Sequence, residues 1–153
     1  MIQKALFGAG CFWGVEEHFR VINGIIKTEV GYSGGHTKNP TYESICYENT
    51  EHAEVLLVEF DKDLISYESL VNEFWKCHDP TTLDRQGPDL GRQYRSVIYY
   101  YNDMQKDIAI KSKEKHQASF QNNIVTEISQ ADIFYKAEEY HQKYIQKGNS
   151  CAI

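Results

Sequence analysis

The feature that most constrains the fold is the sequence at positions 7–14, Phe-Gly-Ala-Gly-Cys-Phe-Trp-Gly. It follows an apolar run at 5–7 that is typical of a strand. Beyond it, side chains return at helical spacing, at Val15, His18, Phe19 and Ile22. Small residues between a strand and a helix favour a tight turn. The sequence therefore predicts a strand, a turn and a helix, with Cys11 at or near the start of the helix.

A cysteine at a helix start is a candidate nucleophile. The unpaired N–H groups and the positive end of the helix dipole favour the thiolate over the thiol. Phe12 and Trp13 would give such a thiolate an apolar wall. A single cysteine is equally often a small buried hydrophobe, so local reasoning leaves both interpretations open. A dinucleotide-binding turn is disfavoured, because the third glycine comes one position late for G-x-G-x-x-G.

Length and charge exclude several classes of protein. The chain has 153 residues, enough for one domain with a real core, and a net charge of -6. That charge argues against nucleic acid or an anionic membrane as a partner. No apolar run approaches the length of a membrane span. The first expected strand begins close to Met1 and leaves no room for a signal peptide, so we expect a cytoplasmic, reducing setting.

The four cysteines, Cys11, Cys46, Cys77 and Cys151, show no C-x-x-C spacing. In a reducing compartment, scattered cysteines indicate redox chemistry or burial rather than a disulfide framework. A zinc site is unexpected, because Cys77 and His78 are adjacent and nothing pairs with them at ligand spacing. We therefore expect no metal and no bound cofactor.

Strand and helix signals alternate along the chain. Strands are expected at 3–7, 26–32, 52–60, 94–101 and 124–128, and helices at 11–20, 41–47, 66–78, 103–120 and 137–147. The order predicts an α+β fold, a two-layer sandwich with a mixed, mostly antiparallel sheet, flanking helices and a ferredoxin-like plait as its core. Residues 1–147 would form a single catalytic domain, and 148–153 a mobile tail that carries Cys151.

Two further details bear on function. Glu54 falls on the more apolar face of the strand at 52–60, although a glutamate near a strand end is usually exposed. The polar segment 79–93 is too long for an ordinary connection and leads straight into a strand, which favours a functional loop.

Five motifs occur in a specific order. They are G-C-F-W-G at 10–14, G-Y-S-G-G at 31–35, N-P-T-Y-E at 39–43, H-A-E at 52–54 and D-P-T-T-L-D-R-Q-G-P-D-L-G-R-Q-Y-R-S at 79–96. In this order they strongly resemble the peptide methionine sulfoxide reductases of the A class. The likeness runs from about Ala5 to Lys147 and includes His141-Gln142.

The resemblance implies four catalytic residues. Cys11 matches the nucleophile of the family and Glu54 its catalytic acid. Tyr42 and Tyr94 match the phenols that bind the sulfoxide oxygen. For Glu54 to act as an acid at neutral pH its pKa must be raised, which burial near Trp13 would achieve.

The resemblance also implies how substrate is held and what the reaction is. Phe12 and Trp13 match the aromatic residues that hold the S-methyl group, and Asp89 matches a substrate-binding carboxylate. The family reduces the S epimer of methionine sulfoxide, free or in proteins, and is usually recycled by thioredoxin. Thiolate attack on the sulfoxide sulfur would leave Cys11 as a sulfenic acid.

A second thiol would then condense with the sulfenic acid. Cys151 is the candidate resolving cysteine, and Cys46, which shares a helix face with Tyr42, is the fallback. The tail departs from the family pattern, which is longer, rich in glycine and has a tyrosine before the cysteine. The departure concerns recycling rather than reduction.

Three alternatives remain at this point. A thiol peroxidase would also use a low-pKa cysteine, but would place an arginine and a threonine beside it. A cysteine hydrolase would need a histidine base, for which the six histidines offer no signature. A small α+β ligand-binding or interaction module would use the aromatic residues as core, and fold alone does not separate it from an enzyme. For the reductase we expect a monomer.

Overall fold

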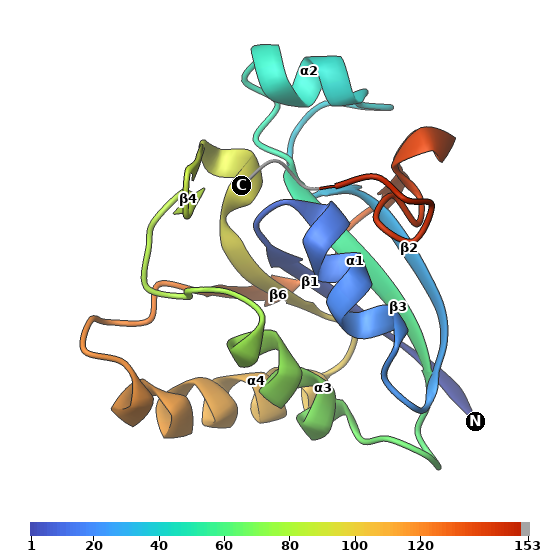
Figure 1. The fold of residues 1–153 in the computed structure, drawn as a ribbon. Helices are drawn as coiled ribbons and strands as arrows, with labels where there is room; N and C mark the ends of the chain where they lie inside the picture. The colour runs from blue at the N-terminus through green and yellow to red at the C-terminus, as the bar shows by residue number, and fades with distance from the viewer. Residues whose placement is uncertain (151–153) are drawn as a thin grey trace.

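The computed structural model describes residues 1–150, and its centre is a six-stranded sheet (Figure 1). The strands lie in the order β7-β6-β1-β3-β2-β8. Every neighbouring pair is antiparallel except β6 and β7, which are parallel. The strands are β1 (Ile2–Ala9), β2 (Ile25–Ser33), β3 (Ala53–Asp61), β6 (Ser96–Tyr100), β7 (Glu127–Gln130) and β8 (Tyr135–Lys136). The predicted α+β class with a mixed, mostly antiparallel sheet is confirmed.

The long helices cover one face of this sheet. The helices are α1 (Phe12–Arg20), α2 (Tyr42–Tyr47), α3 (Tyr67–Lys76) and α4 (Asp103–His116). In Figure 1, α1, α3 and α4 pack beside the sheet, whereas the short α2 lies beyond one end of it. Along the chain, α1 connects β1 to β2, and α3 follows β3 and precedes the segment that leads to β6; both helices pack in the same core cluster.

Alternation along β3 divides the apolar residues between two clusters. Leu56, Val58 and Phe60 face the helices, and Val55 and Leu57 face the opposite side, as their spacing predicts.

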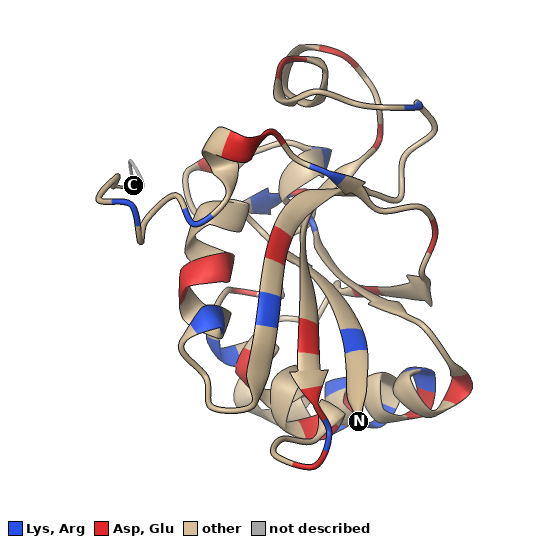
Figure 2. Cartoon of the chain, turned by 90° about the vertical axis from the view of Figure 1, so that its right-hand side faces the viewer, with Lys and Arg blue, Asp and Glu red and all other residues tan. Residues whose placement is uncertain are grey.

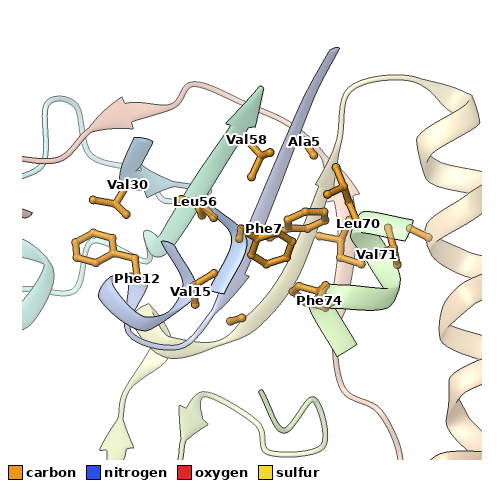
Figure 3. Close-up of a cluster of buried hydrophobic side chains, with 14 of the residues drawn as sticks. Ala5, Phe7, Phe12, Val15, Val30, Leu56, Val58, Leu70, Val71 and Phe74 are labelled. Carbon is orange, nitrogen blue, oxygen red and sulfur yellow. The ribbon is translucent and has the colours of Figure 1, made fainter. Parts of the chain in front are cut away.

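Phe7 of β1 lies at the centre of the larger cluster (Figure 3). Its ring centroid is 5.4 Å from that of Phe19 on α1 and 5.3 Å from that of Phe74 on α3. One strand residue thus packs two helices onto the sheet.

Local signals placed the helix starts correctly. Thr41, Ser66 and Asn102 are N-caps, and each side chain accepts a hydrogen bond from the backbone N–H three residues on. Cys11 is the N-cap of α1, as predicted, although its side chain makes no capping hydrogen bond.

The segment expected as an open loop at 79–93 is more regular than predicted. It contains a short hairpin, β4 (Arg85–Gln86) and β5 (Asp89–Leu90), followed by the 3-10 helix η1 (Arg92–Tyr94). Tyr94 therefore ends a 3-10 turn and does not begin the strand, which starts at Ser96.

The strand expected at 124–128 is shifted toward the C-terminus and forms at Glu127–Gln130. The Ile124 N–H donates to Oε1 of Gln117 (2.8 Å), and the Val125 N–H donates to the Pro80 carbonyl (2.9 Å). Because these backbone groups bond elsewhere, pairing with β6 begins only at residue 127.

The prediction of a helix at 137–147 is wrong. After β8 the chain forms only the 3-10 turn η3 (Glu139–His141) and further turns. The side-chain oxygen of Gln142 accepts a hydrogen bond from the Val30 N–H, and its side-chain N–H donates to the Val30 carbonyl (2.9 Å each). Lys143 has a left-handed φ of 54°. Such a φ interrupts a right-handed helix. We call residues 135–148 the C-terminal strap.

Glu16 anchors the strap to α1 and is only 1% exposed. Its carboxylate accepts hydrogen bonds from the Thr28 hydroxyl (2.7 Å) and from the Lys143 N–H (2.7 Å). The Lys143 ammonium lies 2.9 Å from Oε2. A buried charge is tolerated when it is paired and hydrogen-bonded in this way.

No helix among residues 1–150 is long and apolar enough to cross a membrane. Figure 2 shows acidic and basic residues interspersed over the helices and strands.

We expect Glu16→Gln to lower the free energy of unfolding by about 1.5–3 kcal/mol, the contribution of a hydrogen bond to a charged group. Glu17→Gln is the matched control, because Glu17 forms a half-exposed ion pair with Arg20 and should cost less than about 1 kcal/mol. Urea unfolding of both variants measures the difference. Equal losses would mean that Glu16 does not anchor the strap.

Candidate functional site

Cys11 lies where β1 turns into α1. Gly10 makes the turn with a φ of +93°, which favours glycine. A Cβ at Gly10 would lie 2.7 Å from Cγ of Gln86, so the β4–β5 hairpin packs directly against the turn. The thiol is therefore placed at a helix N-terminus, with the hairpin as a neighbour.

The carboxyl group of Glu54 lies against the same turn. Glu54 is 1% exposed, and its Oε1 accepts a hydrogen bond from the Phe12 N–H (3.2 Å). No described residue hydrogen-bonds to the buried Oε2. The structure thus buries Glu54, contrary to the exposed position that is usual for this residue type.

Burial raises the pKa of Glu54 to about 8. The Phe12 N–H works in the opposite direction because it stabilises the carboxylate, and the negative charge of Asp89 raises the pKa further. At neutral pH the neutral carboxylic acid predominates, with a proton available next to Cys11.

Tyr42 and Tyr94 come from different elements but share this environment. Tyr42 begins α2 and Tyr94 ends η1, and both are half-buried. Burial raises the pKa of each phenol, and the charge of Glu54 raises both further. Cys11 and Asp89 also act on Tyr94. Both hydroxyls remain protonated donors across the neutral range.

Two aromatic residues after Cys11 are held by the strap. The Phe12 ring is buried, with its centroid 5.2 Å from that of His141. The Trp13 indole N–H donates to Nδ1 of His141 (2.9 Å), and its ring stacks on Tyr144 at 3.8 Å and 10°. Burial lowers the pKa of His141, so its neutral form can accept this hydrogen bond.

Sequence reasoning gave no role to Glu138, which bonds the backbone of Tyr42, or to Tyr32, which bonds Glu138. Glu138 accepts a hydrogen bond from the Tyr42 N–H at one oxygen and from the Tyr32 hydroxyl at the other (2.9 Å each). Tyr32 lies within the G-Y-S-G-G motif, which was the available signal. Glu138 had none, because it was assigned to a helix that does not form.

A cavity of about 380 Å³ opens beside Cys11. Asp89 also lines it, whereas Glu54, Tyr42 and Tyr94 do not. Its lining residues are Ala9, Cys11, Gly14, Val15, His18, Cys77, Gln86, Gly87, Pro88 and Asp89.

The other cysteines differ in their surroundings. Cys46 is half-buried and hydrogen-bonds with the Tyr42 side chain. Cys77 packs against the core, donates to the Phe74 carbonyl (3.3 Å), and has its pKa raised to about 12 by burial. Cys151 lies outside the described residues. Within residues 1–150 no cluster of three His, Cys, Asp or Glu side chains could hold a metal ion.

The chain is similar to proteins of one known family. Residues 3–152 match the family model PMSR, peptide methionine sulfoxide reductase. The chain is 57% identical over 148 residues to the peptide methionine sulfoxide reductase MsrA of Methanosarcina mazei. The alignment covers 95% of this chain and 70% of the relative.

Two solved structures of yeast Mxr1 are also similar. Mxr1 from Saccharomyces cerevisiae in reduced form has a TM-score of 0.92 and 36% identity, covering 96% of this chain and 86% of that one. Mxr1 in complex with Trx2 has a TM-score of 0.67 and 27% identity, and the match covers 94% of this chain and 84% of that one. The chain belongs to the peptide methionine sulfoxide reductase family, whose members are oxidoreductases that reduce methionine sulfoxide in peptides to methionine.

Proposed function

We propose that the chain reduces methionine S-sulfoxide, free or in proteins, with Cys11 as nucleophile and Glu54 as acid. The observation that carries this proposal is the buried Glu54 carboxyl group, hydrogen-bonded to the residue that follows Cys11. A neutral acid beside a thiol at a helix start fits attack on sulfur with protonation of oxygen. Residues 1–147 would act as one catalytic domain.

The reaction begins with attack of the Cys11 thiolate on the sulfoxide sulfur. Negative charge builds on the sulfoxide oxygen as its bond to sulfur weakens, and Glu54 supplies the proton. The protonated oxygen then passes from the methionine sulfur to the cysteine sulfur while the S–S bond formed by the attack breaks, so that methionine leaves reduced and Cys11 becomes a sulfenic acid. The two electrons that reduce the substrate come from the thiol.

Tyr42 and Tyr94 would donate hydrogen bonds to the developing oxyanion. Their pKa values are raised by burial, so neither phenol loses its proton at neutral pH. Donors fixed in place before reaction stabilise such charge without reorganisation. Glu138 supports this role for Tyr42, because it fixes the backbone from which the phenol extends.

The aromatic pair would hold the S-methyl group of the substrate. Phe12 is packed against Tyr32 and His141, and Trp13 is held by a hydrogen bond and a stacked ring. An apolar wall next to polar donors suits a sulfoxide, which presents a methyl group beside a polar S–O bond. Asp89, half-buried in the cavity lining, would bind another part of the substrate.

Cys151 would resolve the sulfenic acid by forming a disulfide with Cys11 and releasing water. Tyr144, seven residues earlier, stacks on Trp13. Residues 144–149 are folded into turns, with the Asn149 N–H bonded to the Tyr144 carbonyl. Once these turns open, seven extended residues span roughly 23–25 Å, which would let Cys151 reach Cys11. The yeast Mxr1 complex with Trx2 supports thioredoxin as the external dithiol that then reduces the disulfide.

We expect Glu54→Gln to slow reduction of the S epimer roughly 10²–10⁴-fold in a single turnover, because a positioned acid contributes about that much. Glu59→Gln, on the same strand, is the matched control and should react like wild type. Rapid-quench measurement of methionine gives both rates. A Glu54→Gln rate close to wild type would remove Glu54 from the role of acid.

The single-turnover rate should fall above about pH 8, because Glu54 is active as the protonated acid and its pKa is about 8. Ionisation of Cys11 to its thiolate would instead raise the rate as pH increases, so the falling limb identifies the loss of an acid. Rates measured from pH 6 to 10 should show this basic limb in wild type. If the rate of Glu54→Gln also fell above about pH 8, a group other than Glu54 would be responsible for the decrease.

Mass spectrometry after one turnover without reductant should detect a Cys11–Cys151 disulfide peptide. In Cys151→Ser, the Cys11 sulfenic acid should persist and be trapped by dimedone. Cys46→Ser is the control and should still form the disulfide. A Cys11–Cys46 peptide in wild type would instead make Cys46 the resolving residue.

A further inference from the structure

Gly14 is a helix residue whose lack of a side chain nothing inside the fold requires. It lies in the first turn of α1, and its φ is not among the positive values that favour glycine. A Cβ built at Gly14 would meet no atom within 4 Å. Glycine in a helix costs about 1 kcal/mol relative to alanine, so an advantage must lie outside the packing of the chain itself.

The surface that Gly14 leaves open is part of the cavity beside Cys11. The other walls come from α1, from the end of α3 and from the β4–β5 hairpin, through Val15, His18, Cys77, Gln86, Gly87 and Pro88. At about 380 Å³ the cavity falls within the range of sites that bind small ligands. A side chain at Gly14 would project into this space.

Hydrogen bonds and close packing hold the walls of the cavity together. The Gln86 side chain accepts from the Asp79 N–H (2.9 Å) and donates to the Asp79 carbonyl (2.8 Å), which ties the hairpin to the end of α3. Gly10 lets the same side chain pack against the turn before Cys11. Walls fixed in advance lower the entropy cost of ordering protein side chains when a ligand binds.

The dimensions of the cavity suit a short extended peptide. Cys11 and His18 both line it, and seven residues of helix rise about 10 Å. An extended chain covers that distance in about three residues. The end at Cys11 is where the sulfoxide must lie if Cys11 attacks it, so the cavity continues from the reacting sulfur along the polypeptide that carries it.

The charges along the cavity indicate which peptides it accepts. Asp89 lines the cavity, and its charge acts on Glu54 and Tyr94, the candidate partners of Cys11. His18, in contrast, lies 3.5 Å from Oε2 of Glu73. Among the described residues Asp89 is the only carboxylate in the lining. Glu73 behind His18 is paired with His18 and with Lys76 (3.8 Å), so the charge preference rests on Asp89. Acidic residues beside the methionine sulfoxide would be repelled, and basic residues attracted.

We propose that this cavity is a subsite for the residues adjacent to methionine sulfoxide in a polypeptide substrate, and that it disfavours acidic neighbours. The inference rests on the proposed role of Cys11. It adds a reason for Gly14: an extended chain can lie against bare helix backbone.

The test compares Gly14→Trp, which fills the cavity, with Gly14→Ala, which leaves most of it open. Each is assayed with dithiothreitol on free methionine S-sulfoxide and on a pentapeptide with methionine sulfoxide at its centre. Gly14→Trp should lose about tenfold or more in kcat/KM on the pentapeptide and change less than about twofold on the free amino acid. Gly14→Ala, which adds one methyl group to the bare helix backbone, should match wild type on the free amino acid and lose activity on the pentapeptide, by less than Gly14→Trp. Circular dichroism and thermal unfolding confirm that each variant is folded.

A second measurement uses wild type alone. A pentapeptide with lysine on both sides of methionine sulfoxide should be reduced several-fold more efficiently than one with glutamate, and the ratio should shrink at high salt. Equal efficiency would overturn the charge preference.

Three results would overturn the subsite. Equal losses of Gly14→Trp on both substrates would place its effect at the reacting sulfur. A loss seen only when thioredoxin replaces dithiothreitol would assign the cavity to the reductant. No loss on either substrate would leave the cavity without a role. The proposed function is tested separately, because Cys11→Ser should abolish activity on both substrates whatever Gly14 does.

Discussion

A carboxyl group that is removed from water must either find strong partners for its charge or retain its proton. The carboxyl group of Glu54 accepts a hydrogen bond from the Phe12 N–H and is 1% exposed. That hydrogen bond joins β3 to the turn that carries Cys11. The close approach depends on small residues: a Cβ at Gly8 would lie 3.2 Å from the Glu54 carbonyl and 2.7 Å from the Val97 side chain.

The C-terminal strap completes the site by side-chain hydrogen bonds in place of regular structure. Gln142 bonds the backbone of β2, and Glu16 bonds the backbone and ammonium of Lys143. Held between these two points, His141 contacts the aromatic rings at the start of α1. The irregular backbone is thus a consequence of long-range bonds that a helix would break.

Features set by neighbouring residues could be predicted from the sequence. Alternation put Glu54 on the same face as Leu56, and the cap residues marked three helix starts. Features set by distant partners could not be predicted. The strap depends on Gln142 and Val30, 112 residues apart, so its local helix propensity was overridden. Resemblance to a family named the candidate residues and implied burial of Glu54 near Trp13, but its contact with the Phe12 N–H is visible only in three dimensions.

The central claim is that burial keeps Glu54 neutral at physiological pH. Its most direct test is a carbon-13 NMR titration of protein with labelled glutamate carboxyl carbons, with the Glu54 signal assigned by its loss in Glu54→Gln. The account predicts a midpoint near pH 8. A midpoint near 4.5, the ordinary value for glutamate, would contradict it, because the carboxylate would then be ionised throughout the neutral range.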